Sequence, residues 1–509
     1  MPAPTTPDLL KNVRRLEVVY PAFRRHREAL SLLGSQVVYA TCISNNKGAE
    51  SGLALVRFSG AIESAFGMTR EVLFYYTPHR DLQFRDFKGA RVALRSLNRE
   101  VTPDLIFMCS EDERLDIKLD DWSKLEFTAI PLSPHLDEDP LSVISLIRDH
   151  IFARDLFYET SPVKGNRFFG RKTLLQSLRD DLNHQRVPAL FGLRKSGKTS
   201  VLYQLAEELE TPSTVTVLID LESLPSPPDD PTPDLIADLK TKLQLQLKAK
   251  KQRTREIAEL GNQPSIVEFK NALQGLLHRL SDDDVQVVLM LDEIEYLTPS
   301  DRVDIEEGDM PRIAQLLGAL RSLVQENDNF TFMLSGLTSA ITESGRLYGR
   351  PNPLFSWAKT HYLAPLLPEE ADELARSTGG RMGIELTDGA LESLYEASGG
   401  HAYLYRNFAS FVVSSLPLDV YRRRIERSDV LRQSIPWRRS IAGNIEEMLA
   451  HLERYYPVEH ILLDILRESP QDFAEISRAE ERAFNHLIQL GLVMEENNEI
   501  QLNTILQIS

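Results

Sequence analysis

The 509-residue sequence predicts an α/β protein whose central part is a parallel sheet covered by helices. Three observations support this fold class. Apolar runs of strand length alternate with amphipathic helical patterns between residues 187 and 366. A glycine-rich turn joins the first of these runs to a helical pattern. The composition, with 42% hydrophobic and 26% charged residues, is that of a globular protein and excludes a disordered or membrane-embedded chain.

The first 155 residues predict a separate α/β domain. Its apolar runs suit strands covered on both faces, although buried helix segments have a similar pattern; the runs are residues 71–77, 90–97, 103–110 and 125–132. An acidic cluster at residues 110–121 could bind a metal, but a solvated loop is the simpler interpretation. This part contains no recognisable catalytic constellation, so the sequence leaves its role open.

The central sheet is predicted from five apolar runs. They occupy residues 187–191, 214–221, 285–297, 329–337 and 360–366. Amphipathic helical patterns separate them, at residues 199–209, 265–280 and 311–326. The proline-rich segment 225–233 fits a loop within this domain, because prolines do not sit inside helices or central strands. This alternation predicts parallel strands with helices on both faces.

Residues 192–199 have the spacing of a phosphate-binding loop, the P-loop, between a strand and a helix. Gly192 and Gly197 allow the main chain to curl close to a phosphate, so that amides and the positive helix end face the anion. Lys198 can reach the β- and γ-phosphates, and the Thr199 hydroxyl can complete a magnesium shell. The predicted nucleotide ligands of this loop are Gly192, Arg194, Lys195, Ser196, Gly197, Lys198, Thr199 and Ser200.

Two acidic residues end the third apolar run of the sheet. At a strand end beside the glycine loop, Asp292 would hold magnesium and Glu293 would polarise the attacking water. A capping or turn role is the alternative for a lone acidic pair, but the upstream motif favours catalysis. Ser335 and Thr338 lie just past the end of the fourth predicted strand, and one of them could contact the γ-phosphate, while helix capping at Thr338 or Ser339 is equally consistent with the pattern.

Several segments together resemble the STAND ATPases of prokaryotes, which are signal-transducing relatives of AAA+ proteins and of archaeal replication initiators. The resemblance covers about residues 160–415, and its motifs lie at residues 167–178, 192–200, 289–295, 352–375 and 394–409. It implies ATP and Mg²⁺ as cofactors, with Phe169 and Arg171 near the adenine. It also implies a helical lid and slow, switch-like turnover. The residues alone do not distinguish ATP from GTP; the resemblance favours adenine.

The sequence allows two interpretations for each of three arginines and one histidine. Arg321, Arg346 and Arg350 are candidates for sensing the γ-phosphate or acting on a neighbouring subunit, but solvated surface arginines are commoner. His401 could reach the nucleotide side of the lid, or it could simply follow a capping turn.

The C-terminal part predicts three helices and a hairpin, an arrangement that resembles a winged helix. Residues 458–509 contain three arginines against ten acidic residues, which opposes binding in a DNA groove and favours protein docking. The preceding run, residues 421–439, carries seven arginines and Trp437. Nucleic-acid contact is possible there, but pairing with acidic surfaces of the chain is favoured.

These observations predict four parts: an N-terminal α/β domain (1–155), a P-loop ATPase core (160–365), a helical lid with a basic connector (366–440) and a winged-helix-like domain (441–509). The predicted function is a Mg-dependent ATPase switch that binds a protein partner through its N-terminal and winged-helix domains, with nucleotide-dependent oligomerisation possible. The alternatives are a nucleotide-gated DNA-binding protein and a defence sensor with an N-terminal effector domain.

Net charge and cysteine content indicate which partners and which cellular compartment to expect. A net charge of −17 provides no whole-chain attraction to nucleic acid or to an anionic bilayer. Only two cysteines are present, too few for a disulfide framework. The sequence also has no signal-peptide pattern and no run of about 18 apolar residues, so we expect a cytoplasmic protein with no membrane partner.

Overall fold

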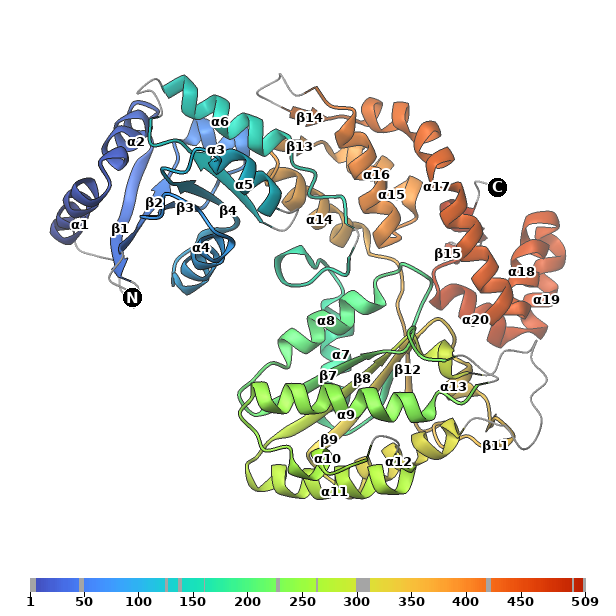
Figure 1. The fold of residues 1–509 in the computed structure, drawn as a ribbon. Coiled ribbons are helices and arrows are strands. Elements are labelled where there is room, and N and C mark those ends of the chain that lie inside the picture. Colours follow the sequence, from blue (N-terminus) through green and yellow to red (C-terminus); the bar gives the residue numbers. More distant parts are fainter. Residues whose placement is uncertain are drawn as a thin grey trace. The chain divides into compact units, whose positions relative to one another are not determined.

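A computed structural model describes residues 6–44, 50–123, 127–135, 140–159, 161–225, 229–261, 264–298, 312–417, 423–496 and 499–506 (Figure 1). The chain divides into two compact units. The first contains Met1–Thr160, Asp372–Leu394 and Arg406–Ser434, and the second contains Ser161–Ala371, Tyr395–Tyr405 and Ile435–Ser509. Each unit therefore combines segments that are far apart in the sequence. None of the helices in the described ranges is both long and apolar enough to cross a membrane.

The first unit is built on a five-stranded mixed sheet in the order β1-β2-β3-β4-β5. The first three strands pair antiparallel and the last three parallel. The strands are β1 (Gln36–Ser44), β2 (Glu50–Arg57), β3 (Glu71–Tyr76), β4 (Val101–Cys109) and β5 (Thr128–Leu132). The helices are α1 (Thr6–Val19), α2 (Pro21–Leu32), α3 (Gly60–Phe66), α4 (Phe84–Ser96), α5 (Leu115–Trp122) and α6 (Pro140–Phe152).

Both faces of this sheet are covered, as the continuous apolar strands predict. In β4, Phe107 packs into the cluster formed with α1, α2, α3 and α6, whereas its neighbours Ile106 and Met108 pack into the cluster formed with α4 and α5. Successive strand residues face opposite sides of a sheet, so a run that is apolar throughout must be buried on both. The α/β prediction for this domain therefore agrees with the structure.

Of the two interpretations of residues 90–97, the helical one holds and the strand is wrong, because residues 90–96 belong to α4. Its buried residues Phe87, Ala90 and Leu94 recur at helical spacing, while Val92 is 67% exposed, which a doubly covered strand would not allow. The loop interpretation of the acidic cluster also fails in part, since Leu115–Trp122 forms α5. No group of three or more His, Cys, Asp or Glu side chains suited to a metal occurs among the residues that the structure describes.

Later segments of the chain complete the first unit. The elements concerned are α14 (Pro368–Gly380), β13 (Ile384–Leu386), α15 (Asp388–Ser398), α16 (Ala402–Ser414), β14 (Arg423–Ile425) and α17 (Arg427–Tyr455), of which the unit takes the parts named above. The buried carboxylate of Asp104 on β4 accepts hydrogen bonds from Arg154 and from Arg381. A Cβ atom on Gly67 would lie 1.4 Å from the carbonyl oxygen of Gly380, so the two segments touch through their backbones.

The second unit contains the predicted parallel sheet, in the order β12-β6-β9-β8-β7 (Figure 1). The strands are β6 (Pro188–Phe191), β7 (Thr214–Asp220), β8 (Gln286–Asp292), β9 (Phe330–Gly336) and β12 (Lys359–Tyr362), and every pair in this sheet is parallel. The helices are α7 (Lys172–Asn183), α8 (Lys198–Glu208), α9 (Thr232–Ala249), α10 (Arg255–Ala258), α11 (Ile266–Asp282), α12 (Ile313–Glu326) and α13 (Ala340–Glu343). Short elements are the helical turns η1 (Gly165–Arg167) and η2 (Ile294–Leu297) and the pair β10 (Arg346–Leu347) and β11 (Arg350–Pro351).

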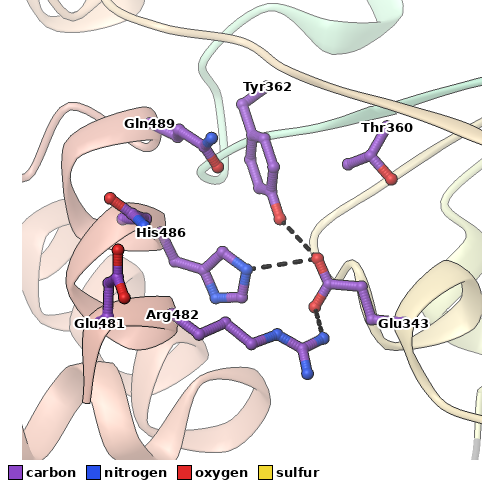
Figure 2. A pocket seen from close by; sticks show the side chains of 8 residues that line it. Glu343, Thr360, Tyr362, Glu481, Arg482, His486 and Gln489 are labelled. Atoms are coloured by element: carbon purple, nitrogen blue, oxygen red, sulfur yellow. Dashed lines mark hydrogen bonds and ion pairs between the residues drawn. The ribbon is translucent and has the colours of Figure 1, made fainter. Parts of the chain in front are cut away.

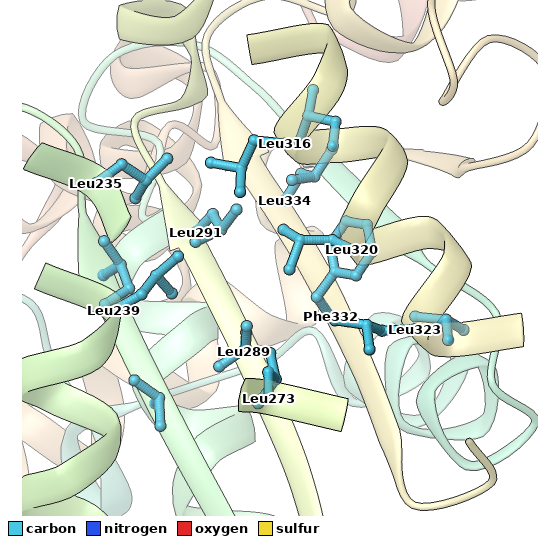
Figure 3. Close-up of a cluster of buried hydrophobic side chains, with 14 of the residues drawn as sticks. Leu235, Leu239, Leu273, Leu289, Leu291, Leu316, Leu320, Leu323, Phe332 and Leu334 are labelled. Carbon is cyan, nitrogen blue, oxygen red and sulfur yellow. The ribbon is translucent and has the colours of Figure 1, made fainter. Parts of the chain in front are cut away.

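Helices cover both faces of this sheet. Leu289 and Leu291 of β8 pack with α9, α11 and α12 in the cluster drawn in Figure 3, whereas Val288 and Met290 pack with α7 and α8 on the other face. All five predicted strands are present, and the long helix α9, which follows the proline-rich loop, was not predicted. Parallel order places the carboxyl ends of β6, β8 and β9 at one edge, where ligands bind such sheets.

The C-terminal part of the second unit has the predicted order of three helices followed by a hairpin. These elements are α18 (Pro457–Glu468), α19 (Pro470–Ala479), α20 (Glu481–Gln489), the antiparallel strands β15 (Val493–Glu496) and β16 (Glu499–Leu502), and the turn η3 (Thr504–Leu506). We refer to Pro457–Leu506 as the C-terminal module.

Candidate functional site

The glycine-rich loop connects the end of β6 to the start of α8. Gly197 precedes the helix with φ 101°, a left-handed conformation that favours glycine, and a Cβ atom there would lie 2.8 Å from Nη1 of Arg171. At Gly192 a Cβ atom would lie 3.0 Å from both Leu363 Cβ and Ser196 Oγ. Because α8 starts at Lys198, the amides of the first helical turn point into the loop. This geometry matches the requirement for an anion held by main-chain amides and a helix end.

Lys198 and Thr199 lie at the mouth of this loop. The Lys198 side chain is only 5% exposed, and its Nζ donates to the carbonyl oxygens of Gly192 (3.2 Å) and Leu193 (3.1 Å). The Thr199 hydroxyl donates to Oδ2 of Asp292 at 2.7 Å. The two motifs are 93 residues apart in sequence, and the sheet order brings them into direct contact.

Asp292 and Thr199 form a donor set suited to a hard divalent cation. Burial raises the pKa of Asp292, while the hydrogen bond from the Thr199 hydroxyl opposes this shift. A bound cation would relieve the burial cost of the carboxylate, because it supplies the opposite charge. One carboxylate and one hydroxyl fit Mg²⁺, which takes few protein ligands and completes its shell with water and phosphate oxygens.

Glu293 adopts a left-handed backbone conformation, φ 59°, directly after the strand. Burial raises its pKa to about 8, with a further contribution from the neighbouring carboxyl of Glu295. A raised pKa makes the ionised carboxylate a stronger proton acceptor, which suits a general base. The sequence-predicted acids therefore lie together: Asp292 faces Thr199, and Glu293 follows at the same edge.

Glu295 is part of this edge, although the sequence analysis did not single it out. It is 6% exposed, and its Oε2 accepts the backbone N–H of Leu337 at 2.9 Å. A Cβ atom on Gly336 would lie 2.4 Å from that oxygen, so Gly336 allows the turn after β8 to approach the end of β9. The available signal was the third acidic residue of the Asp-Glu-Ile-Glu run, in an otherwise apolar segment.

Ser335 is fully buried at the end of β9, where the pairing of Leu334 with Leu291 puts it next to Asp292, and its Oγ has no hydrogen-bond partner in the described structure. It therefore belongs to the same site as the two motifs. Thr338 Oγ1 accepts the N–H of Ala340, the first residue of α13, at 3.2 Å, and the N-cap residue of that helix is Ser339.

Arg171 lies against the glycine-rich loop. Its Nη2 donates to the carbonyl oxygen of Ser196 at 2.7 Å, its backbone N–H donates to Glu370, and burial lowers its pKa to about 10. Its Nε has no hydrogen-bond partner in the described structure. This position is beside the phosphate loop, whereas the resemblance implies a role near the adenine for this segment. Phe169, two residues earlier, is half-buried.

The tip of the loop contacts α17. Nε of Arg194 lies 3.2 Å from Oε1 of Glu447, and Nζ of Lys195 donates to Oδ1 of Asn444 at 2.9 Å. The Lys195 ammonium also lies 5.1 Å from the ring centre of Tyr403 on α16. In this arrangement the two basic side chains face α17 and α16.

His401 connects the start of α16 to the same loop. It is 5% exposed, and burial lowers its pKa to about 4, with the cations of Arg171 and Lys198 acting in the same direction. The imidazole is therefore neutral at pH 7. Its Nε2 donates to the carbonyl oxygen of Arg194 at 3.3 Å, while Nδ1 accepts the N–H of Leu404. Both sequence interpretations therefore have a matching contact: Nδ1 caps the start of α16, and Nε2 contacts the phosphate loop.

The candidate sensor arginines have structural contacts. Arg321 donates to the carbonyl oxygen of Pro353 at 2.6 Å and lies over the ring of Trp357. Arg346 donates to the carbonyl oxygen of Gly349 in the β10–β11 turn.

Several arginines of the basic connector form ion pairs. Tyr421 and Arg422 lie outside the described residues. Arg424, Arg427 and Arg432 have acidic partners, and Arg423 is buried with its guanidinium over the ring of Phe152. Ion pairs of this kind are expected if the arginines of the basic connector pair with acidic side chains of the same chain.

Comparison with known proteins finds similarity for the central region of the chain. A family model described as an AAA domain matches residues 179–342, and no curated protein matches the chain. Among solved structures, the Walker-type ATPase of Pyrococcus abyssi is similar at 16% identity and a TM-score of 0.49, over 69% of this chain and 99% of the other. The ORC2 protein of Aeropyrum pernix is similar at 14% identity and a TM-score of 0.43, over 70% of this chain and 96% of the other. The RuvB Holliday junction branch migration motor of Thermotoga maritima is similar at 16% identity and a TM-score of 0.33, over 66% of this chain and 92% of the other.

The match to the AAA model spans both motifs of the site. It includes the glycine-rich loop and the strand end that carries Asp292 and Glu293. The chain therefore carries an AAA-type P-loop ATPase domain.

Proposed function

We propose that this chain is a magnesium-dependent ATPase of STAND type, a switch whose nucleotide state controls binding of a protein partner. The observation that carries the proposal is the 2.7 Å hydrogen bond from the Thr199 hydroxyl to Asp292. It brings the phosphate loop and the acidic strand end to one point, where a triphosphate and a divalent cation can be held together.

Each residue of the site has a separate task in hydrolysis. The loop amides and the Lys198 ammonium bind the phosphate oxygens, and Thr199 and Asp292 would hold Mg²⁺. The cation, when bound, neutralises charge on those oxygens. Glu293 accepts a proton from water as the water oxygen forms its bond to the γ-phosphorus and the bond to the ADP oxygen breaks. The products are ADP and inorganic phosphate.

Contacts at the tip of the loop support the switch part of the proposal. His401 donates to the Arg194 carbonyl, and Glu447 pairs with the Arg194 side chain. A phosphate group in the loop would compete with Glu447 for Arg194 and would reach the lid helix α16 through His401. Nucleotide binding can therefore change how α16 and α17 are held, which is the differential contact that a switch needs.

We further propose a protein as the partner, bound through the N-terminal domain or the C-terminal module. Residues 458–509 carry ten acidic residues against three arginines, which opposes contact with DNA phosphates. Arg424, Arg427 and Arg432 in the basic connector already face carboxylates, so fewer cations are free for nucleic acid.

Phosphate release from ATP, measured with Mg²⁺ and again with a chelator, tests the proposed activity. We expect slow release that requires the cation, and release at the same rate with the chelator would contradict the assignment. For the switch, the Glu293→Gln protein held in ATP should capture a partner that the same protein in ADP does not. Identical capture in both nucleotides would contradict a nucleotide-controlled partner.

A further inference from the structure

The segment that follows β9 at the nucleotide site contacts the residue that precedes the C-terminal module. Ser335 lies beside Asp292, and four residues later the backbone N–H of Ser339 donates to the phenolic oxygen of Tyr456 at 3.1 Å. Tyr456 is 6% exposed and immediately precedes α18. The turn between β9 and α13 is thus hydrogen-bonded to the residue that precedes the module.

The next contact lies at the end of α13. Figure 2 shows the Glu343 carboxylate between Tyr362 on β12 and two side chains of α20. Its Oε1 accepts the Tyr362 hydroxyl at 3.0 Å and lies 3.2 Å from Nε2 of His486, and its Oε2 accepts from Arg482. We call Glu343, Tyr362, Arg482 and His486 the Glu343 cluster.

The Glu343 cluster is held on the module side as well. Nδ1 of His486 lies 2.6 Å from Oε1 of Glu459 on α18. Burial disfavours both charged forms, but their mutual contacts outweigh it: the pKa of Glu343 falls to about 2 and that of His486 rises to about 9. Both groups are therefore charged at neutral pH. The imidazolium bridges a carboxylate of the ATPase core and a carboxylate of the module.

A cavity of about 450 Å³ adjoins the Glu343 cluster, so this contact has room to rearrange. Its lining includes Thr360 of the core and the α20 side chains Glu481, Asn485 and Gln489. Arg482, Asn485 and Gln489 recur at intervals of three and four residues, which puts them on one face of α20. That face turns toward Glu343, and its polar groups border the cavity instead of a packed apolar surface.

A second attachment joins the module to the lid turn. Nδ2 of Asn503 donates to the carbonyl oxygens of Gly399 (3.1 Å) and Gly491 (2.8 Å). Gly399 begins the turn that ends at His401, whose ring contacts the phosphate loop. The module therefore touches elements from two sides of the nucleotide site: the end of β9 and the turn before α16.

We propose that the Glu343 cluster couples the nucleotide site to the C-terminal module. It closes α20 against the ATPase core in one nucleotide state and releases the polar face of α20 in the other. This inference rests on the proposed function, because the coupling needs a nucleotide whose state changes the end of β9. The carboxylate of Glu343 is the element that both sides share, so its loss should disconnect them.

Hydrogen exchange of the full-length protein in Mg-ATP and in Mg-ADP tests the coupling. We expect the amides of α20 to exchange at rates that differ roughly 5- to 30-fold between the two nucleotides, the range that one or two kcal/mol of local stability produces. Arg482→Glu should abolish the difference, and Glu343→Arg should do the same. Arg482 is 65% exposed, so its replacement should leave the fold intact. The double variant Glu343→Arg with Arg482→Glu re-forms the ion pair and should restore the difference.

The matched control is Arg478→Glu, the same charge change on exposed α19 of the same module, which should keep the difference. Mg-ATP binding of every variant is measured in parallel by calorimetry. If the wild type binds and hydrolyses ATP but α20 exchanges equally in both nucleotides, the coupling is wrong while the proposed function stands. Retention of the difference in Arg482→Glu, or loss of ATP binding in that variant, would also overturn it. A wild type that binds no ATP overturns the function and the coupling together.

Discussion

Replacement of Lys198 by Ala tests the chemistry of the loop most sharply. The ammonium is 5% exposed at the mouth of the loop, within hydrogen-bond distance of two main-chain carbonyls that border it. In a site closed to water, loss of one preorganised donor to the reacting group typically costs about 10²- to 10³-fold in turnover, or about 2.7–4 kcal/mol. We therefore expect turnover of the Lys198→Ala protein to fall by at least that factor.

The assay is steady-state phosphate release with saturating Mg-ATP, together with the thermal midpoint of each protein. Lys240→Ala is a matched control, because the Lys240 ammonium also donates to two main-chain carbonyls, those of Leu260 (2.6 Å) and Gly261 (3.2 Å), away from the site. Both variants lose similar contacts of the fold, but only Lys198→Ala should lose turnover. Wild-type turnover in Lys198→Ala, or an equal loss in Lys240→Ala, would refute the reasoning.

Three further predictions concern the edge of the sheet and the C-terminal module. Glu293→Gln removes the proton acceptor and should lower single-turnover hydrolysis about 10²- to 10⁴-fold while Mg-ATP still binds; hydrolysis at the normal rate would remove Glu293 from its role. Gly336→Ala would put a Cβ atom 2.4 Å from Oε2 of Glu295, so urea unfolding should show a loss of about 1–3 kcal/mol from overpacking. Equal stability of that variant would contradict the close approach. The pKa of His486 is raised from 6.5 to about 9, so its contribution to stability is complete below pH 6.5 and is lost as the pH rises through about 9. Thermal midpoints should fall across that window in the wild type and less so in His486→Gln; parallel curves would exclude the contribution.

The sequence predicted the central sheet well, because β6, β8 and β9 are mainly apolar and buried and the helices between the strands have regular spacing. The run at 90–97 fits a strand or a helix, since apolar residues of a short helix and of a strand look alike without their partners. The buried spacing of Phe87, Ala90 and Leu94 becomes visible only when the sheet is present. Strands β1 and β2 were not predicted. Their apolar residues, at 37–43 except Thr41 and at 53–56, were available in the sequence.

The phosphate loop and the acidic strand end were predictable because their chemistry fixes residue types at fixed spacings. The contacts around them were not. Glu295 is recognised only when β9 approaches it through Gly336. The position of Arg171 beside Ser196, and of Glu447 beside Arg194, depends on long-range packing between segments more than 20 and more than 200 residues apart, respectively. No local pattern specifies such pairings.

Calorimetric titration with Mg-ATP tests the central claim most directly, namely that the loop, Lys198, Thr199 and Asp292 form one site for a nucleotide and its cation. The account predicts binding of one nucleotide per chain that weakens when Mg²⁺ is removed, is strongly reduced in Lys198→Ala and is kept in Lys240→Ala. A titration of the folded wild type with no heat, and no shift in its thermal midpoint, would contradict it.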